Sequence, residues 1–220
     1  MKYIVKGAEP KRLTNWKELR NDNWEPTYQN LDTGVKIATK NELMKEQGYI
    51  CCYCERRLTD EDSHIEHFRP QSDVLVDALD YSNLLSSCQK QLKKKEPRHC
   101  GNYKDEWFDE ELLISPLDPA CETRFVYTAD GEIYPSLDDA AAIQTINHLN
   151  LDLPKLISLR AAAIAPFLDE ELSFEEVNDF VTGYLKQKDG NFAEFWTTIR
   201  SLFPLDITQP GKNAAVVGGV

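Results

Sequence analysis

Cysteine, histidine and glutamate side chains are concentrated in the twenty residues from 51 to 70. Cys51 and Cys54 form a Cys-x-x-Cys pair, and His64, Glu66 and His67 follow shortly afterwards. A Cys-x-x-Cys turn presents two thiolates to one ion, which is typical of tetrahedral zinc sites. Imidazole and carboxylate groups serve as ligands and bases in hydrolytic metal chemistry. The segment therefore predicts a metal centre, or two of them.

A closed zinc site needs two more thiolates. Cys88 and Cys100 can supply them, although eleven residues separate the two, which is wider than usual. We therefore predict a structural Zn²⁺ bound by Cys51, Cys54, Cys88 and Cys100. Buried or unpaired thiols are the alternative, and a redox Cys-x-x-Cys is disfavoured because no βαβ pattern surrounds it. The remaining cysteines, Cys52 and Cys121, are predicted to be buried core thiols.

The opening residues MKYIVKGAEPKRL lack the apolar run of a signal peptide, and no later segment approaches the roughly 18 apolar residues that span a bilayer. We expect a cytoplasmic protein that does not act at a membrane. Because that compartment keeps thiols reduced, metal ligands are favoured over disulfides.

The residues after the first cysteine pair suit hydrolysis of a phosphodiester by one hard cation. Such a reaction needs a few ligands, a base for the attacking water, and a group that orients the base. Glu66 can ligate the ion, and His67, with an unperturbed pKa of about 6.5, can take the water proton. Asn83 can hold the His67 ring in one tautomer by a hydrogen bond.

These residues resemble a known nuclease motif. Glu66-His67, Asn83-Leu84 and the run from Cys100 to Lys104 are similar to the HNH, or ββα-metal, motif. The segments CCYCERRL, HIEHFRP, DYSNLLSSC and HCGNYK resemble the HNH proteins of retron and Septu antiphage systems, the PtuB-like nucleases encoded beside an ABC/SMC-type ATPase. The resemblance continues through ISPLDP to the helix near residue 140, so it covers most of the chain.

The resemblance implies roles for individual residues. Glu66 becomes a ligand of the catalytic metal, His67 the general base, and Asn83 the residue that orients it. The family pattern has Asn or His directly after the fourth cysteine, but this sequence has Gly101 there. We therefore expect Asn102 to supply the second ligand, with His99 as the alternative.

Two further polar residues flank this pair. His64 precedes Glu66 by two residues, hence on the same side of a strand. It is a candidate third metal ligand or substrate contact, with a structural imidazole as the alternative. Arg69 lies just beyond His67 and is a candidate for binding the scissile phosphate; the alternative is a solvent-exposed or ion-paired arginine.

The formal charge of −12 is unevenly distributed. Residues 1–104 contain 18 basic and 16 acidic side chains, whereas residues 105–220 contain 7 and 21. A basic patch on an acidic protein can still bind phosphates, although a solvated loop is the alternative. The predicted nucleic-acid contacts are Lys90, Lys93, Lys94, Lys95, Arg98 and Lys104.

The elements that must position these residues form an α+β, mostly helical fold. We predict a zinc-stabilised ββα-metal (HNH) module with a flanking β-hairpin at 125–135 and a C-terminal helical region. The predicted parts are an extended N-terminal segment 1–35, a nuclease module 36–120, and a partner-docking region 121–220 that ends in a disordered tail. Helices are predicted at 35–44, 140–149, 154–167, 173–186 and 192–202, with a short helix possible within 81–88.

The sequence thus favours a metal-dependent endonuclease that uses Mg²⁺, with Mn²⁺ or Ni²⁺ as substitutes, beside a structural Zn²⁺. The resemblance implies a toxic effector of phage defence, with nucleic acid as substrate and a PtuA-like ABC/SMC-type ATPase as partner. A complex with a retron reverse transcriptase and its msDNA is a further expected partner. DNA is the favoured substrate, an RNA such as tRNA is one alternative, and a catalytically silent zinc-binding adaptor is another.

Overall fold

A computed structural model describes residues 1–205 of the chain, and the predicted disordered tail at 211–220 lies outside them. The helices are α1 (Lys11–Lys17), α2 (Thr33–Glu46), α3 (Gly101–Lys104), α4 (Ala140–Leu149), α5 (Pro154–Ile164), α6 (Phe174–Leu185) and α7 (Trp196–Leu202). The strands are β1 (Ser63–His67), β2 (Leu84–Cys88), β3 (Phe125–Tyr127) and β4 (Ile133–Pro135). Short 3-10 helices are η1 (Tyr81–Asn83), η2 (Pro119–Thr123) and η3 (Ala165–Phe167). The described chain is α+β and mostly helical, as predicted.

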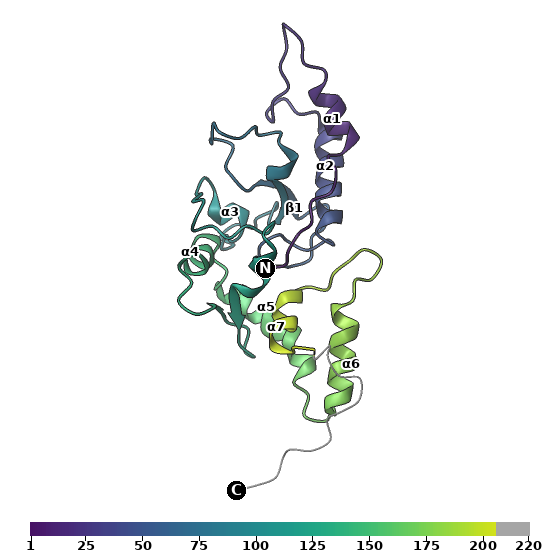
Figure 1. Ribbon diagram of the computed structural model, residues 1–220, viewed down its shortest axis with the longest axis vertical. Coiled ribbons are helices and arrows are strands. Elements are labelled where there is room, and N and C mark those ends of the chain that lie inside the picture. The colour runs from purple at the N-terminus through teal and green to yellow at the C-terminus, as the bar shows by residue number, and fades with distance from the viewer. Residues whose placement is uncertain (206–220) are drawn as a thin grey trace.

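The molecule is elongated, with the strand pair that carries the histidines near its middle (Figure 1). Helices α1 and α2 pack together at one end, and α6 and α7 lie at the other, while β1, α3 and α4 occupy the space between. Within residues 1–205, no helix is both long and apolar enough to cross a membrane.

Strands β1 and β2 form an antiparallel pair that is followed in sequence by α3. The register places His64 opposite Ser87 and Glu66 opposite Leu85. Residues 81–88, predicted as a short helix, are helical only in η1 and then continue as β2. The strand prevails because the Gln47 side chain, at the end of α2, hydrogen-bonds both the N–H and the C=O of Ser86. The order strand, strand, helix is that of a ββα unit.

Local capping signals set the remaining helices. Asp139 accepts a hydrogen bond from the Ala142 N–H, so α4 has the predicted bounds. Ser173 and Glu176 form the predicted capping box at the start of α6. Strands β3 and β4 form the predicted hairpin, and Gly131 adopts a φ of 86° in its turn.

Two segments differ from the prediction because tertiary contacts override the local pattern. The N-terminal segment, expected to be extended, contains α1, whose Leu13 is fully buried against a cluster that includes Leu43 of α2. The last helix begins at Trp196 instead of 192. The Phe192 and Phe195 N–H groups donate to carbonyl oxygens of the first cysteine segment and of the turn before it, and those bonds hold 192–195 outside the helix.

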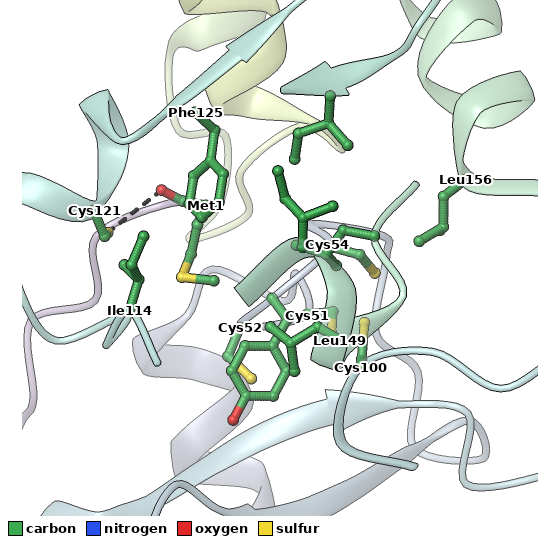
Figure 2. Packing of buried hydrophobic residues seen from close by; sticks show 14 of the residues in the cluster. Met1, Cys51, Cys52, Cys54, Cys100, Ile114, Cys121, Phe125, Leu149 and Leu156 are labelled. Atoms are coloured by element: carbon green, nitrogen blue, oxygen red, sulfur yellow. Dashed lines mark hydrogen bonds between the residues drawn. The ribbon is translucent and has the colours of Figure 1, made fainter. Parts of the chain in front are cut away.

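The largest cluster of buried apolar residues surrounds the cysteines. It joins the cysteine segment to β3 and β4, to α4, and to Leu156 of α5 (Figure 2). A second cluster lies between α1, α2 and the strand pair, and a third between α5, α6 and α7. The cysteine region therefore shares its core with the hairpin and with the first C-terminal helices.

Candidate metal centres and active site

Four buried cysteines converge at the centre of the largest core cluster. One sulfur from each of Cys51, Cys54, Cys88 and Cys100 lies within 4.8 Å of the other three. Four sulfurs at that spacing can surround one tetrahedral Zn²⁺. The predicted ligand set is thus brought together, and the wide separation of Cys88 and Cys100 in sequence is spanned by an intervening loop. Burial acts to raise the pKa of Cys51, one of the four clustered cysteines, but contacts with neighbouring thiols hold that pKa well below its ordinary value.

The other two cysteines, Cys52 and Cys121, have different surroundings. Burial raises the pKa of Cys52 well above its ordinary value, and its side chain lies apart from Cys51 and Cys100 (Figure 2). Cys121 is fully buried, and its thiol donates to the Met1 carbonyl at 3.4 Å. Both residues are core thiols, as predicted.

His99 belongs to the cysteine cluster. Its Nδ1 lies 3.0 Å from the Cys100 sulfur and 3.8 Å from that of Cys88, and its ring is fully buried. With Nδ1 protonated, the His99 ring would donate to a cysteine thiolate that holds Zn²⁺ and would stabilise its negative charge. The structure therefore does not place His99 at Glu66, where it was the alternative second ligand.

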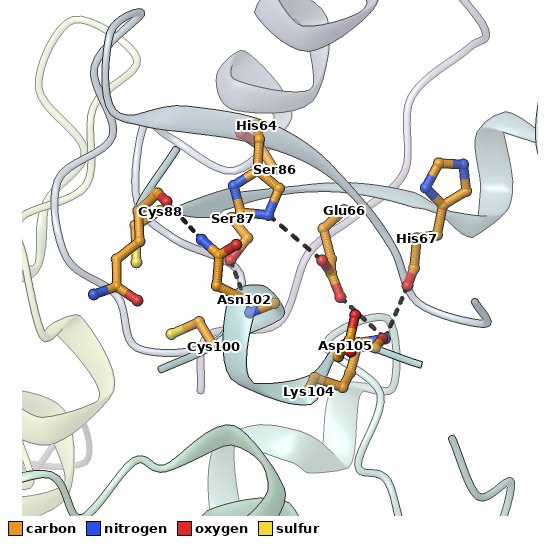
Figure 3. A network of polar contacts seen from close by, with 12 residues as sticks. His64, Glu66, His67, Ser86, Ser87, Cys88, Cys100, Asn102, Lys104 and Asp105 are labelled. Carbon is orange, nitrogen blue, oxygen red and sulfur yellow. Dashed lines mark hydrogen bonds and ion pairs between the residues drawn. The ribbon is translucent and has the colours of Figure 1, made fainter. Parts of the chain in front are cut away.

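Glu66 is held in a buried polar network. Its Oε1 accepts from the Tyr53 hydroxyl at 3.1 Å and pairs with the Lys104 ammonium at 3.2 Å (Figure 3). Its Oε2 faces His64 Nε2 at 3.6 Å, which is longer than a hydrogen bond. Oε1 of Glu66 is thus fixed by protein groups. Oε2 and His64 Nε2 lie close enough together that both could bind the same cation.

Gly101, at the start of α3, leaves room for that arrangement. A β-carbon at this position would lie 2.1 Å from Glu66 Oε2 and 3.1 Å from His64 Nε2. Gly101 therefore borders the space between the two candidate ligands, and a side chain at this position would enter it. Asn102, the predicted second ligand, is turned the other way and donates to the Gln89 carbonyl (Figure 3). The structure brings His64, and not Asn102, to Glu66.

The His67 ring lies on the opposite face of β1. Figure 3 shows it directed away from the Glu66 carboxylate, as alternation along a strand requires. Its Nε2 contacts the Ala78 carbonyl at 2.9 Å, so this nitrogen carries the proton of the neutral ring. Tyr28 packs edge-on at 4.5 Å, and burial lowers the pKa of His67 from 6.5. The ring is therefore neutral at pH 7, with Nδ1 unprotonated.

Asn83 and Arg69 hold the loop that follows β1. The Asn83 amide accepts from the Arg69 N–H at 2.8 Å and donates to the Arg69 carbonyl at 2.9 Å. It therefore orients the backbone beyond His67, and the Ala78 carbonyl contacts the ring in the place expected for Asn83. The Arg69 guanidinium pairs with Asp73 at 2.9 Å and lies over the Phe108 ring. This is the ion-paired alternative for Arg69.

The predicted basic patch divides into two groups. Five of its side chains are exposed on the loop between β2 and α3: Lys90, Lys93, Lys94, Lys95 and Arg98. Lys104 is buried, with its Nζ bonded to Glu66 and to the carbonyls of His67 and Phe68. Lys104 therefore cannot contact nucleic acid at the surface, and it positions Glu66 instead.

Tyr53 and Ser87 contribute to the site without having been predicted. Tyr53 lies between two cysteines of the first pair, and only the fold turns its hydroxyl toward Glu66. The Ser87 hydroxyl accepts from the Gly101 N–H at 3.2 Å and lies 3.7 Å from the Cys51 sulfur. Its place opposite His64 follows from the strand register, which the sequence alone does not provide.

The fold and site thus define a mostly helical α+β protein that carries a buried four-cysteine cluster beside a histidine–glutamate pair. The chain is 30% identical over 159 residues to a Vibrio cholerae protein described as "Retron Vc95 putative HNH endonuclease". The aligned region covers 67% of this chain and 74% of that protein. The chain is 35% identical over 97 residues to the Escherichia coli "Retron Ec83 putative HNH endonuclease", or 40% of this chain and 37% of that one. No protein-family model matches the chain.

The first of these similarities spans about three quarters of the relative. The chain therefore belongs to the family of retron HNH endonucleases.

Proposed function

We propose that this chain is a metal-dependent endonuclease that hydrolyses phosphodiester bonds of nucleic acid, with DNA as the favoured substrate. The observation that carries the proposal is the pairing of His64 Nε2 with Glu66 Oε2 in front of Gly101. A structural zinc protein has no need of a buried carboxylate that keeps one oxygen out of its hydrogen-bond network. The pair therefore disfavours a silent adaptor.

His64 and Glu66 are the residues that would hold the catalytic cation. The carboxylate oxygen suits the hard ions Mg²⁺ and Mn²⁺, and the imidazole nitrogen suits Ni²⁺, so this mixed donor set offers a ligand to each of the three ions. When bound, such an ion polarises the scissile phosphate and stabilises the leaving oxygen. The Tyr53 and Lys104 contacts fix the Glu66 carboxylate, so its second oxygen is oriented before substrate arrives.

Two imidazoles are candidates for the base that takes the proton of the attacking water. His67 is favoured by the family resemblance and by its neutral ring with an unprotonated Nδ1, but its ring is directed away from the Glu66 carboxylate and would have to turn toward the cation to act as the base. His64 is favoured by its position, because it shares a face of β1 with Glu66. We assign the base to His67 and the ligand role to His64, and variants of the two separate these roles.

The test is a cleavage assay with Mg²⁺ on plasmid DNA, single-stranded DNA and total RNA. We expect His67→Ala to abolish cleavage while leaving Mg²⁺ affinity intact, and His64→Ala to weaken both. Cleavage that survives in His67→Ala but not in His64→Ala would transfer the base to His64. A wild-type chain that cuts only RNA would change the substrate, and one that cuts nothing with or without its partner would favour the adaptor.

The acidic C-terminal half supports a role within a complex. Residues 105–220 contain 21 acidic and 7 basic side chains, which repel free nucleic acid. We propose that this half docks on an ABC/SMC-type ATPase, and that the pair is a toxic effector of phage defence. The assay is therefore run with and without that ATPase. Equal rates in the two cases would exclude a restraining role of the acidic surface.

A further inference from the structure

A groove of about 510 Å³ lies between α2 and β1, and His64 is one of its lining residues. Three lysines line it, Lys36 and Lys40 from α2 and Lys90 from the loop after β2, and none of its lining residues is acidic. On a chain with a net charge of −12, a groove with only cationic charge is a distinct electrostatic site.

The lysines are available to a ligand to different degrees. Lys36 and Lys40 are four residues apart and so share one face of α2. Lys40 donates to the Asp60 carbonyl at 2.6 Å and lies 3.7 Å from its carboxylate. Within residues 1–205, neither Lys36 nor Lys90 forms an ion pair, and both are exposed. Two uncompensated ammonium groups thus face the groove.

The walls of the groove add apolar and aromatic surface. The Tyr28 ring lies under the Lys36 ammonium at 4.7 Å, and the Ile37 side chain is 53% exposed. A row of cations beside an aromatic ring is the combination that binds a nucleic-acid strand, because cations contact phosphates and rings stack on bases or sugars. An acidic protein segment would use the lysines but not the ring.

His64 joins this groove to the candidate active site. His64 is among the residues that line the groove, and its Nε2 is the atom that faces Glu66 Oε2 at 3.6 Å. We infer that the groove of Lys36, Lys40 and Lys90 binds the sugar-phosphate backbone of a nucleic acid next to the bond that is cut. The inference rests on the proposed function for the identity of that bond, but binding itself requires no cleavage.

The test is binding of a fluorescent oligonucleotide, measured by anisotropy against salt concentration in buffer without added Mg²⁺. The Lys36→Gln/Lys90→Gln double variant keeps Lys40 and its bonds to Asp60. We expect it to weaken binding by about tenfold and to reduce the salt slope by about two, one for each lysine. A Lys186→Gln/Lys188→Gln double variant makes the same charge change beyond α6 and should leave both quantities unchanged.

The outcomes separate the two proposals. If the groove variant binds like the control variant while the wild type cleaves, the groove assignment is overturned and the nuclease stands. If the wild type binds through the groove but never cleaves, the nuclease fails and the groove stands. Two further results for the Lys36→Gln/Lys90→Gln variant would overturn the assignment to a nucleic-acid strand. In one, the variant binds the oligonucleotide normally but no longer binds inorganic triphosphate. In the other, it binds the oligonucleotide normally but no longer associates with the ATPase.

Discussion

Gly101 approaches Glu66 so closely that a β-carbon at position 101 would lie 2.1 Å from the Glu66 Oε2 atom. Gly101 has no side chain, so the start of α3 provides space at this place and no ligand. The space is bordered by His64, which comes from the same strand as Glu66. The candidate cation site is therefore built on β1 alone, with α3 closing it from one side.

The first prediction concerns this contact. Gly101→Ala should displace the Glu66 carboxylate, abolish Mg²⁺-dependent cleavage and reduce the free energy of unfolding by roughly 1–3 kcal/mol, as overpacking does in cores. Gly183→Ala in α6 is the matched control, since no atom lies within 4 Å of the added carbon. That control should be neutral or stabilise by roughly 0.5–1 kcal/mol. Full activity in Gly101→Ala would show that the carboxylate position is unimportant.

A second prediction concerns the buried ion pair of Glu66 and Lys104, whose side chains are 8% and 1% exposed. Glu66→Gln or Lys104→Met alone leaves one buried charge without its partner, so each should reduce the free energy of unfolding by roughly 3–5 kcal/mol. The double variant should lose much less than the sum. Urea unfolding of the zinc-loaded proteins measures this coupling. The exposed Arg20–Glu25 pair provides the comparison, for which we expect almost no coupling.

A third prediction concerns zinc. The purified chain should contain one Zn²⁺, and chelation should unfold the region around the cysteines, because the ion holds segments that are distant in sequence. Cys51→Ser and Cys100→Ser should lose the metal, whereas Cys52→Ser should retain it. Elemental analysis and circular dichroism report the two effects. Equal zinc content in all three variants would contradict the four-cysteine assignment.

The fourth prediction is a pH dependence at Asp139. Its pairing with Arg124, together with hydrogen bonds from the start of α4, lowers its pKa below the ordinary value of 3.8. The unfolded chain binds this proton more readily, so the stabilisation is complete above pH 3.8 and is lost as pH falls through the folded-state pKa. Asp139→Asn should therefore be less stable than the wild type at pH 6, and the difference should shrink on acidification. A constant difference across that range would exclude the ion pair as its source.

Signals that act over a few residues were sufficient for much of the fold. The α4 helix and the α6 capping box follow from short polar motifs, and the β3–β4 hairpin follows from Asp130-Gly131. The four-cysteine cluster was predictable because zinc ligation restricts which thiols can meet. In each case, the residues that form the cap, the turn or the metal site also show in the sequence where that feature occurs.

Other features depend on contacts between distant segments. Residues 84–88 form a strand because β1 and Gln47 satisfy their backbone groups, and the start of α7 is shifted by bonds to the cysteine segment. Within the site, the motif identified Glu66, but not Lys104 as its partner or Asn102 as turned away. The direction of a side chain depends on register and on neighbouring elements, neither of which a motif specifies.

Ser87 gives the two centres a common part. Its hydroxyl lies near the Cys51 sulfur and accepts the Gly101 N–H, so the cysteine cluster and the floor of the cation site are joined through one side chain. A newly synthesised chain would then remain inert until it acquired zinc. We expect the proposed nuclease activity to follow the zinc supply as well as the level of expression, so that zinc starvation keeps the protein inactive.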